Sequence, residues 1–544
     1  MEKIALMIND RWLMVRRWIR ENRLEFVLLI LILFSGAFFR LYKISEYMTF
    51  LGDEGRDAIV VRRLLVDFDP ILIGPRTSIG DMYLGPLYYY LMAPAMLLSG
   101  LSPVGPSVQM ALLGVATVFL IWFVAREWFS PRKGKLAIGA LIAAGLYSLA
   151  PVVIEHARHS WNPNIMPFFA LSIIYGLWKI WSPFAKATEG QAESSKRFNW
   201  LIVVGVSFAF VLQSHYLGLL LAPTIGLFWL LSFIKAKSSK LKAQSFLQHS
   251  AFGLVIFVFL MSPLVIFDAR HGWRNFASMK KFFGERQSTV SARPWTALPK
   301  FPETVTLVAT RLIAGKNETA GEFSALILSI GSGFVFFKLI YATVKKRKLS
   351  YNLKAYLVLL TWLGFAFIGL GLYKQHIYDH YYGFFFPAPF LLLGGFAENM
   401  TQSAKSVGKM AILVGFALLL YINLAENPLK YPPNRQMQRT ISVSEKISEE
   451  ARGERFNIAV IAERNYEDAY QYFLEKEREP IVDIDALRAD ETITEQLFVV
   501  CELPKEKCDP THDPKAEVAN FGWSKIDNEW VVAGVTLFRL VHTQ

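Results

Sequence analysis

The chain has 544 residues, of which 53% are hydrophobic and only 19% are charged, whereas an average soluble domain carries about 25% charged residues. Apolar runs of membrane-spanning length recur from Leu24 to about Ala425, which excludes a string of soluble domains, a disordered chain, a coiled coil and a disulfide-dense secreted scaffold. The net charge of +13 comes from basic clusters in short connections between apolar runs, where such residues mark the cytoplasmic side of a membrane, so we expect no nucleic-acid partner.

The hydropathy pattern predicts a multi-pass membrane protein with a cytoplasmic basic N-terminus over residues 1–23 and a membrane-embedded helical domain over 24–425. The N-terminal stretch lacks a small-residue cleavage site, so we interpret the first apolar run as an uncleaved anchor. Several runs are shorter than the ~20 residues of a full crossing. The eleven predicted spans are 24–42, 106–125, 136–154, 164–181, 200–214, 217–234, 251–267, 323–344, 354–372, 383–397 and 409–425.

A further apolar stretch over 85–100, GPLYYYLMAPAMLLSG, is predicted to be an interfacial half-span that bends at Pro94. If this stretch crossed the membrane fully, every later basic cluster would move to the outer side, against the positive-inside rule. A half-span keeps all the basic clusters inside.

This topology places three large polar segments on the outer face. They are a loop over 43–84, a second loop over 268–322 that is rich in Arg, Lys, Trp and Phe, and a soluble domain over 426–544. In the soluble domain, alternating apolar residues predict strands at 456–461 and 497–501, a helix at 466–476, and a closing strand or hairpin at 530–541.

The two cysteines of the chain, Cys501 and Cys508, lie seven residues apart in this soluble domain. They either pair in an oxidising outer compartment or remain free thiols in a strand and a turn, and the spacing alone does not decide between the two.

The first outer loop contains an acidic sequence, Gly-Asp-Glu-Gly-Arg-Asp, at residues 52–57, followed by an amphipathic interfacial helix over 58–68. Asp53 and Asp57 are four residues apart and would share one helical face. One interpretation is that Asp53 caps the helix while Glu54 favours its positive dipole end. The other is that a carboxylate here acts as a general base or a metal ligand.

Five histidines fall in three short outer connections, together with Arg, Lys, Tyr and Asn side chains that bind phosphate or sugar hydroxyls. We expect these connections to line a single polar cavity with the first loop. The candidate substrate-binding residues are Arg56, Asp57, Arg76, His156, Arg158, His159, Asn162, His215, Tyr216, Lys374, His376, Tyr378 and His380.

This order of features resembles the GT-C superfamily of lipid-sugar-dependent glycosyltransferases, and in particular the branch with protein O-mannosyltransferases and aminoarabinose lipid A transferases. The resemblance rests on the basic N-terminus, one span, the outer loop with Asp53 and Glu54, the Gly-Pro-Leu-Tyr-Tyr-Tyr segment at 85–90, and the Arg/His-rich second outer turn. It implies a mainly α membrane bundle of GT-C type with a small extracytoplasmic α/β domain.

The resemblance also implies a function. The donor would be a polyprenyl phosphate carrying one sugar, and the acceptor a hydroxyl group on a protein, lipid or glycan at the extracytoplasmic face of the plasma (inner) membrane. The sugar would be transferred with inversion, and the acidic pair of the family would correspond to catalytic Asp53 and Glu54, with Asp53 as the base. Metal use varies within the superfamily, so a divalent ion is left open, with Asp53 as its ligand if one binds.

Cations near the leaving phosphate would lower the barrier, and Arg158, His159, Lys374, His376 and His380 are expected at the right depth. Two other functions fit a polytopic chain with outer loops: a polymerase or ligase that uses lipid-linked sugar, and a flippase. A flippase would need ionisable residues near the middle of its spans, and the predicted spans carry almost none.

Overall fold

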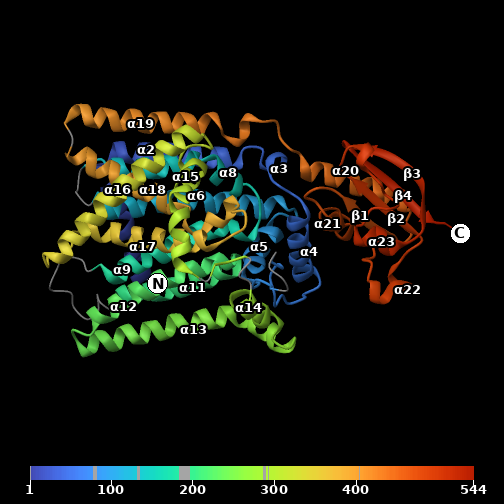
Figure 1. Ribbon diagram of the computed structural model, residues 1–544, viewed down its shortest axis with the longest axis horizontal. Helices are drawn as coiled ribbons and strands as arrows, with labels where there is room; N and C mark the ends of the chain where they lie inside the picture. The colour runs from blue at the N-terminus through green and yellow to red at the C-terminus, as the bar shows by residue number, and fades with distance from the viewer. Residues whose placement is uncertain are drawn as a thin grey trace.

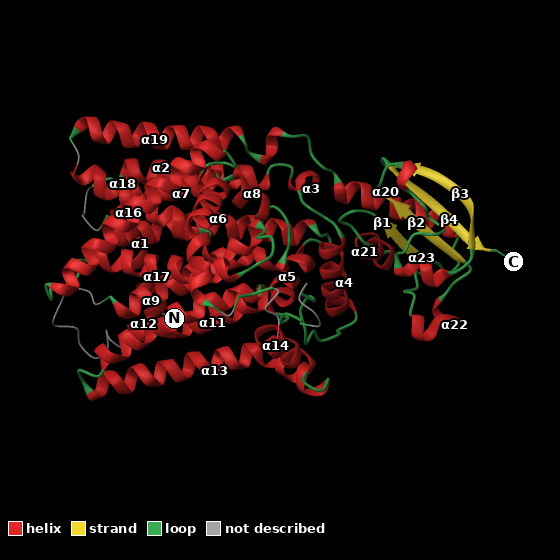
Figure 2. Cartoon of the chain, in the orientation of Figure 1, coloured by secondary structure: helices red, strands yellow, loops and turns green. Residues whose placement is uncertain are grey.

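The structure is a computed structural model that describes residues 2–77, 82–130, 135–182, 196–285, 289–291, 293–403 and 405–543. A long helical bundle carries a small α/β domain at one end (Figure 1). Within the described residues, the only sheet lies in this C-terminal domain (Figure 2).

Nine of the eleven predicted spans are confirmed as helical segments long and apolar enough to cross a membrane, counted over the described part of the chain. The outermost of these helices are apolar on their exposed surface, as Phe259 and Val414 show. A large exposed apolar surface of this kind fits a lipid environment. The corresponding helices are α2 (Arg23–Leu41), α6 (Val104–Phe129), α9 (Met166–Trp181), α11 (Trp200–Ser214), α12 (Ala222–Ala236), α13 (Lys240–Arg270), α16 (Glu318–Val344), α17 (Tyr351–Leu372) and α19 (Ser406–Ala425).

The two other predicted spans are shorter helices in the centre of the bundle. The stretch 136–154 forms α7 (Ile138–Leu149) and α8 (Pro151–His156), because Pro151 holds the preceding Ala150 in an extended conformation. The stretch 383–397 contributes to α18 (Pro387–Ser403). Helices α7 and α18 pack closely, since a Cβ atom at Gly139 would lie 2.1 Å from the carbonyl oxygen of Gly394.

The predicted half-span is α5 (Leu87–Leu98), a twelve-residue helix with Pro94 inside it. At 1.5 Å per residue it rises only about 18 Å, too little to cross the ~30 Å hydrocarbon core of a bilayer. The carbonyl of Leu101, just after α5, accepts a hydrogen bond from Tyr472 of the C-terminal domain. The chain therefore returns to the end of the bundle where that domain sits.

The loop 43–84, predicted to lie on the outer face, contains α3 (Ile44–Tyr47) and α4 (Gly52–Val66), and α4 lies across the end of the bundle next to the C-terminal domain (Figure 1). The stretch 268–322, expected to be a loop, is largely helical. It contains α14 (Arg274–Glu285), α15 (Phe301–Val308) and a π-helical turn (Ala309–Ile313) whose Leu312 and Ile313 are fully buried. Three prolines and Arg311 interrupt its apolar pattern in sequence.

The C-terminal domain is a four-stranded sheet of order β1-β2-β4-β3, in which β1 is parallel to β2 and the other two pairs are antiparallel. The predicted strands, the helix and the hairpin alternative are confirmed, although β3 begins at Ser524. The elements are α20 (Gln436–Ala451), β1 (Asn457–Ile461), α21 (Asp468–Lys476), α22 (Ala489–Thr492), β2 (Gln496–Cys501), α23 (Ala516–Phe521), β3 (Ser524–Val532) and β4 (Val535–His542). Cys501 and Cys508 are paired in a disulfide.

Candidate active site

The site is built around the first turn of α4. Leu51 is extended, so the helix starts at Gly52, and Glu54 folds back so that its Oε2 accepts a hydrogen bond from the Leu51 amide at 3.0 Å. This contact satisfies one of the amides that a helix start leaves unpaired.

Asp53 is the most accessible acid of this turn, with 43% of its side chain exposed. Its Oδ1 accepts hydrogen bonds from Arg56 Nη1 at 2.8 Å and from the Tyr466 hydroxyl at 2.6 Å. Tyr466 belongs to the C-terminal domain, 413 positions away in the chain. A carboxylate held at one oxygen and open to solvent is suited to accept a proton or to bind a polar substrate group.

Arg56 joins Asp53 to Asp57, which is completely buried. The guanidinium donates to Asp57 Oδ1 from Nη2 at 2.8 Å and from Nε at 3.1 Å, and Tyr89 donates to the same oxygen at 3.0 Å. Burial raises the pKa of Asp57, and the Arg56 charge opposes this rise. Asp57 is therefore the buried anchor of Arg56, which in turn positions Asp53.

Glu54 is buried, and burial raises its pKa to about 8, even though the Leu51 hydrogen bond acts in the opposite direction. At neutral pH this carboxyl group is mostly protonated. Its geometry is that of a helix cap, so we no longer expect it to share the catalytic role of Asp53.

The histidines of the three short connections, which were expected to line one polar cavity, lie together in the structure. The rings of His156 and His159 lie 6.3 Å apart, Trp161 lies 6.1 Å from His159 and 4.7 Å from His380, and His380 lies 5.7 Å from His215. These distances join centroids of aromatic rings. Three separate connections of the chain thus form one aromatic and imidazole cluster.

The cluster adjoins α4, since His159 Nε2 lies 3.8 Å from Glu54 Oε1. Burial lowers the pKa of His159, His215 and His380 to about 3. Without a bound anion these imidazoles are therefore neutral, and the supply of cations to a phosphate by His159 and His380 stays a prediction.

Two further candidates have structural contacts. Arg158 donates to the backbone carbonyls of Phe39 and Tyr42 at the end of α2. Asn162 donates to the carbonyl of Ser214 at the end of α11. Both side chains are nearly fully buried, so they join elements of the bundle, and Arg158 is not placed to bind a phosphate as expected.

Of the remaining candidates, Tyr216, His376 and Tyr378 lie beside the cluster. Tyr216 stacks on His215 with ring centroids 4.4 Å apart, and exposed His376 lies 4.6 Å from Tyr378. Exposed Arg76 lies in the connection before α5, where it forms a β-bridge with Tyr83.

Lys374 lines a cavity of about 450 Å³ together with Arg293 and Lys300. Lys300 Nζ donates to the carbonyl of Tyr373 at 2.9 Å. The Tyr373 ring contacts Tyr381, which in turn contacts His380. The basic cavity is therefore a neighbour of the histidine cluster, and sequence reasoning missed Arg293 and Lys300.

The sequence analysis also did not include Arg311 and Lys316 among the candidate site residues. Arg311 forms a two-pronged ion pair with Asp379, and Lys316 lies 2.7 Å from Glu155. Although burial acts to raise the pKa of Asp379, Arg311 outweighs it and the pKa is lowered. The available signal was an arginine inside an apolar helical stretch, since a charge there is costly unless it has a partner.

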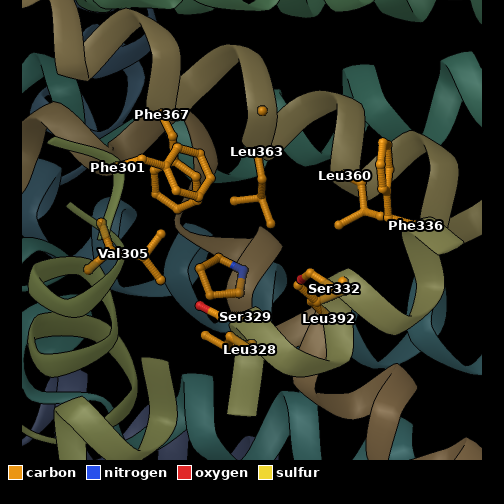
Figure 3. Close-up of a pocket in the computed structure, with 14 residues that line it drawn as sticks. Phe301, Val305, Leu328, Ser329, Ser332, Phe336, Leu360, Leu363, Phe367 and Leu392 are labelled. Atoms are coloured by element: carbon orange, nitrogen blue, oxygen red, sulfur yellow. The ribbon is translucent and has the colours of Figure 1, made fainter. Parts of the chain in front are cut away.

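An apolar cavity of about 350 Å³ lies directly beside the basic one, between α15, α16, α17 and α18 (Figure 3). Its wall begins at Phe301, the residue after Lys300, and includes Phe367, one helical turn before Gly371 of the basic cavity. The polar side chains of its lining are Ser329 and Ser332.

Within the described ranges, no three His, Cys, Asp or Glu side chains lie close enough together to hold a metal ion. Asp53 is the predicted ligand if a metal binds. Among the described residues its hydrogen-bond partners are Arg56 and Tyr466, and both are donors.

Comparison with known proteins gives matches in structure alone: no protein-family model and no curated protein matches the chain. ArnT from Cupriavidus metallidurans bound to undecaprenyl phosphate has a TM-score of 0.54 at 13% identity, over 95% of this chain and 97% of ArnT. Its apo state gives the same TM-score over 94% and 97%.

The archaeal oligosaccharyltransferase AglB from Archaeoglobus fulgidus, in complex with an inhibitory peptide and a dolichol-phosphate, has a TM-score of 0.52 at 12% identity, over 89% of this chain and 70% of AglB. ArnT and AglB are both members of the GT-C superfamily. At these identities the likeness is one of fold, and the chain is a multi-pass membrane protein with the GT-C fold.

Proposed function

We propose that this protein is a membrane glycosyltransferase that moves a sugar from a polyprenyl-phosphate donor to a hydroxyl acceptor at the extracytoplasmic face of the plasma membrane, with inversion. The observation that carries the proposal is Asp53, a half-exposed carboxylate held at the end of the bundle beside a histidine cluster. The acceptor is a protein, a lipid or a glycan.

In this reaction Asp53 accepts the proton of the acceptor hydroxyl while the hydroxyl oxygen forms a bond to the anomeric carbon of the sugar. The bond from that carbon to the phosphate oxygen breaks, and the polyprenyl phosphate leaves with the electron pair. The proton on Asp53 then returns to solvent. Cations near the leaving phosphate stabilise the developing negative charge.

The pair of adjoining cavities supports a lipid-linked donor. Arg293, Lys300 and Lys374 supply positive charge for a phosphate, and the neighbouring apolar cavity accepts the first isoprene units of the lipid. That ArnT was solved with undecaprenyl phosphate and AglB with a dolichol-phosphate is consistent with this arrangement.

The test uses purified protein in liposomes with a panel of labelled prenyl-phosphate sugars and with membrane extract as the source of acceptors. Wild type should consume one donor, and Asp53→Asn should lose at least about 100-fold of that rate. Repeating the assay with a chelator and with added Mg²⁺ or Mn²⁺ measures any metal requirement.

The matched control is Asp67→Asn, since Asp67 is an exposed acid at the other end of the same helix. It should keep wild-type activity. Equal rates for Asp53→Asn and wild type would remove Asp53 from the chemistry. No turnover of any donor by folded wild-type protein would contradict the transferase and favour a flippase or a ligase.

A further inference from the structure

We propose that Tyr466 of the C-terminal domain is a positioning residue of this active site, which fixes the Asp53 carboxylate so that Oδ2 faces the substrate. The proposal rests on the proposed role of Asp53 as the base. It makes the C-terminal domain a part of the catalytic site, although the domain lies outside the bundle in sequence.

Both hydrogen bonds that Asp53 receives end on the same oxygen. Tyr466 donates to Oδ1 at 2.6 Å and Arg56 Nη1 donates to Oδ1 at 2.8 Å, while Arg56 Nη1 also lies 3.4 Å from the Tyr466 hydroxyl. Within the described residues, Oδ2 receives no hydrogen bond from the protein. With the side chain 43% exposed, Oδ2 is the oxygen left to accept the acceptor proton.

The Tyr466 ring has room beside α4 because position 52 is a glycine and carries no side chain. A Cβ atom at position 52 would lie 2.4 Å from Tyr466 Cδ1, which real side chains do not allow, so glycine is required for the ring to reach Asp53. At position 55, a Cβ atom would lie 2.4 Å from the carbonyl oxygen of Asp468. Two glycines on one face of α4 thus let the segment around Tyr466 approach the helix backbone.

The rest of the interface keeps Tyr466 from moving freely. Arg63 pairs with Glu475 at 2.6 Å. The Phe50 ring packs against Phe473 with centroids 5.5 Å apart. Tyr466 lies two residues before α21, in the connection from β1. The docked helix α21 therefore anchors the segment that presents the phenol to Asp53.

Two consequences follow for the reaction. A hydrogen bond to an ionised carboxylate favours the ionised form, so losing the phenol makes Asp53 easier to protonate. The carboxylate also gains freedom to rotate, which misplaces the base relative to the acceptor hydroxyl. Misplacement of a reacting group by about 1 Å costs up to 10²-fold in rate.

The experiment compares Tyr466→Phe with Tyr472→Phe, a second tyrosine of the same interface whose hydroxyl bonds a backbone carbonyl instead of Asp53. We expect Tyr466→Phe to lower kcat about 10- to 100-fold with little change in KM, and to move the acid limb of the pH–rate profile to higher pH. Tyr472→Phe should leave kcat and the profile unchanged. Gly52→Ala, which keeps the phenol but displaces the ring, should act like Tyr466→Phe.

A second readout does not depend on turnover. Carbodiimide labelling of Asp53 across a pH series, quantified by mass spectrometry, reports when the carboxyl group is protonated and accessible. The labelling midpoint should rise in Tyr466→Phe and stay at the wild-type pH in Tyr472→Phe.

An unchanged labelling midpoint in Tyr466→Phe would overturn the inference even if wild type transfers no sugar. An active wild type with an unchanged pH profile in Tyr466→Phe would overturn it as well. An inactive wild type with a raised labelling midpoint would instead contradict the proposed transferase alone.

Discussion

Glu54 and Asp53 are adjacent acids in one helical turn, yet their surroundings separate their chemistry. Burial raises the pKa of Glu54 from its ordinary value of 4.5 to about 8, while half of the Asp53 side chain faces solvent. Between pH 4.5 and about pH 8 the folded protein keeps a proton on Glu54 that the unfolded chain has already released. Stability contributed by this group is therefore complete below pH 4.5 and is lost as the pH rises towards 8.

We predict that Glu54→Gln, which cannot ionise, becomes more stable relative to wild type as the pH rises from 5 to 8. The difference in Tm in detergent should grow by at least about 2 °C over this range, the shift that about 1 kcal/mol produces in a domain of 150–250 residues. Its transferase rate should fall by less than about tenfold, short of the 10²–10⁴-fold that a general base contributes. A Tm difference that stays constant with pH would contradict the protonated state of Glu54.

Some residues of the site could be read from the sequence because their type and position in short outer connections were informative, as for Asp53 and the histidines. Others could not. Tyr466 lies 413 positions from Asp53, and nothing in its local sequence points to α4. Arg158 has the residue type of a phosphate ligand, but its donors are used by carbonyls at the end of α2, and only the packing of two helices reveals this.

At the scale of elements, the contact between α4 and α21 depends on backbone approach. We predict that Gly55→Ala lowers Tm, because the new Cβ atom would lie 2.4 Å from the Asp468 carbonyl oxygen and such overpacking costs about 1–3 kcal/mol. This loss exceeds the ~1 kcal/mol that alanine gains over glycine in a helix.

The matched control is Gly226→Ala in α12, where a Cβ atom meets nothing within 4 Å. It should leave Tm unchanged or raise it, since only the helix preference acts there. Equal effects of the two substitutions would show that α4 and α21 are not packed as closely as described. Thermal unfolding in one detergent checks both.

The apolar cavity between α15 and α18 gives a second prediction at this scale. Gly364 lines the cavity and has open space where a side chain would go. Gly364→Leu should therefore fill the cavity and raise KM for a long-chain prenyl donor by at least about tenfold, equivalent to about 1.4 kcal/mol. KM for a donor with one or two isoprene units should change less.

Gly415→Leu is the control, because Gly415 also has open space but lies on α19, outside the cavity. Steady-state rates with donors of two lengths decide the question. An equal rise in KM for both donor lengths in Gly364→Leu would place the lipid chain elsewhere.

The elements that the sequence predicted well are those set by a local pattern: the apolar spans, α5 as a half-span and the strands of the soluble domain. The predicted loop 268–322 contains helices at 294–313, where three prolines, Lys300 and Arg311 interrupt the apolar residues. Its helices are stabilised by contacts with α16 and α17 and by the Arg311–Asp379 pair. These are tertiary interactions, which a local pattern does not contain.

At the scale of the whole molecule, the placement of the basic clusters predicts how the bundle is oriented in the membrane. The connections between α12 and α13 and between α16 and α17 lie at the end opposite the C-terminal domain (Figure 1). These connections hold basic clusters at 235–242 and 345–348. By the positive-inside rule we expect that end to face the cytoplasm, which would place the candidate active site and the C-terminal domain on the extracytoplasmic side.

This orientation predicts opposite labelling of two introduced thiols. Ser238→Cys lies at an exposed position in the basic α12–α13 connection, and Ala486→Cys at an exposed position in the C-terminal domain. Both natural cysteines are paired with each other, so a maleimide reacts with the introduced thiol. In intact spheroplasts a membrane-impermeant maleimide should label Ala486→Cys at once and Ser238→Cys only after detergent is added, and inverted vesicles should give the reverse. Labelling of both thiols from the same side would contradict the bundle orientation. Labelling of Ser238→Cys alone in spheroplasts would place the Asp53 site on the cytoplasmic side, away from an extracytoplasmic acceptor.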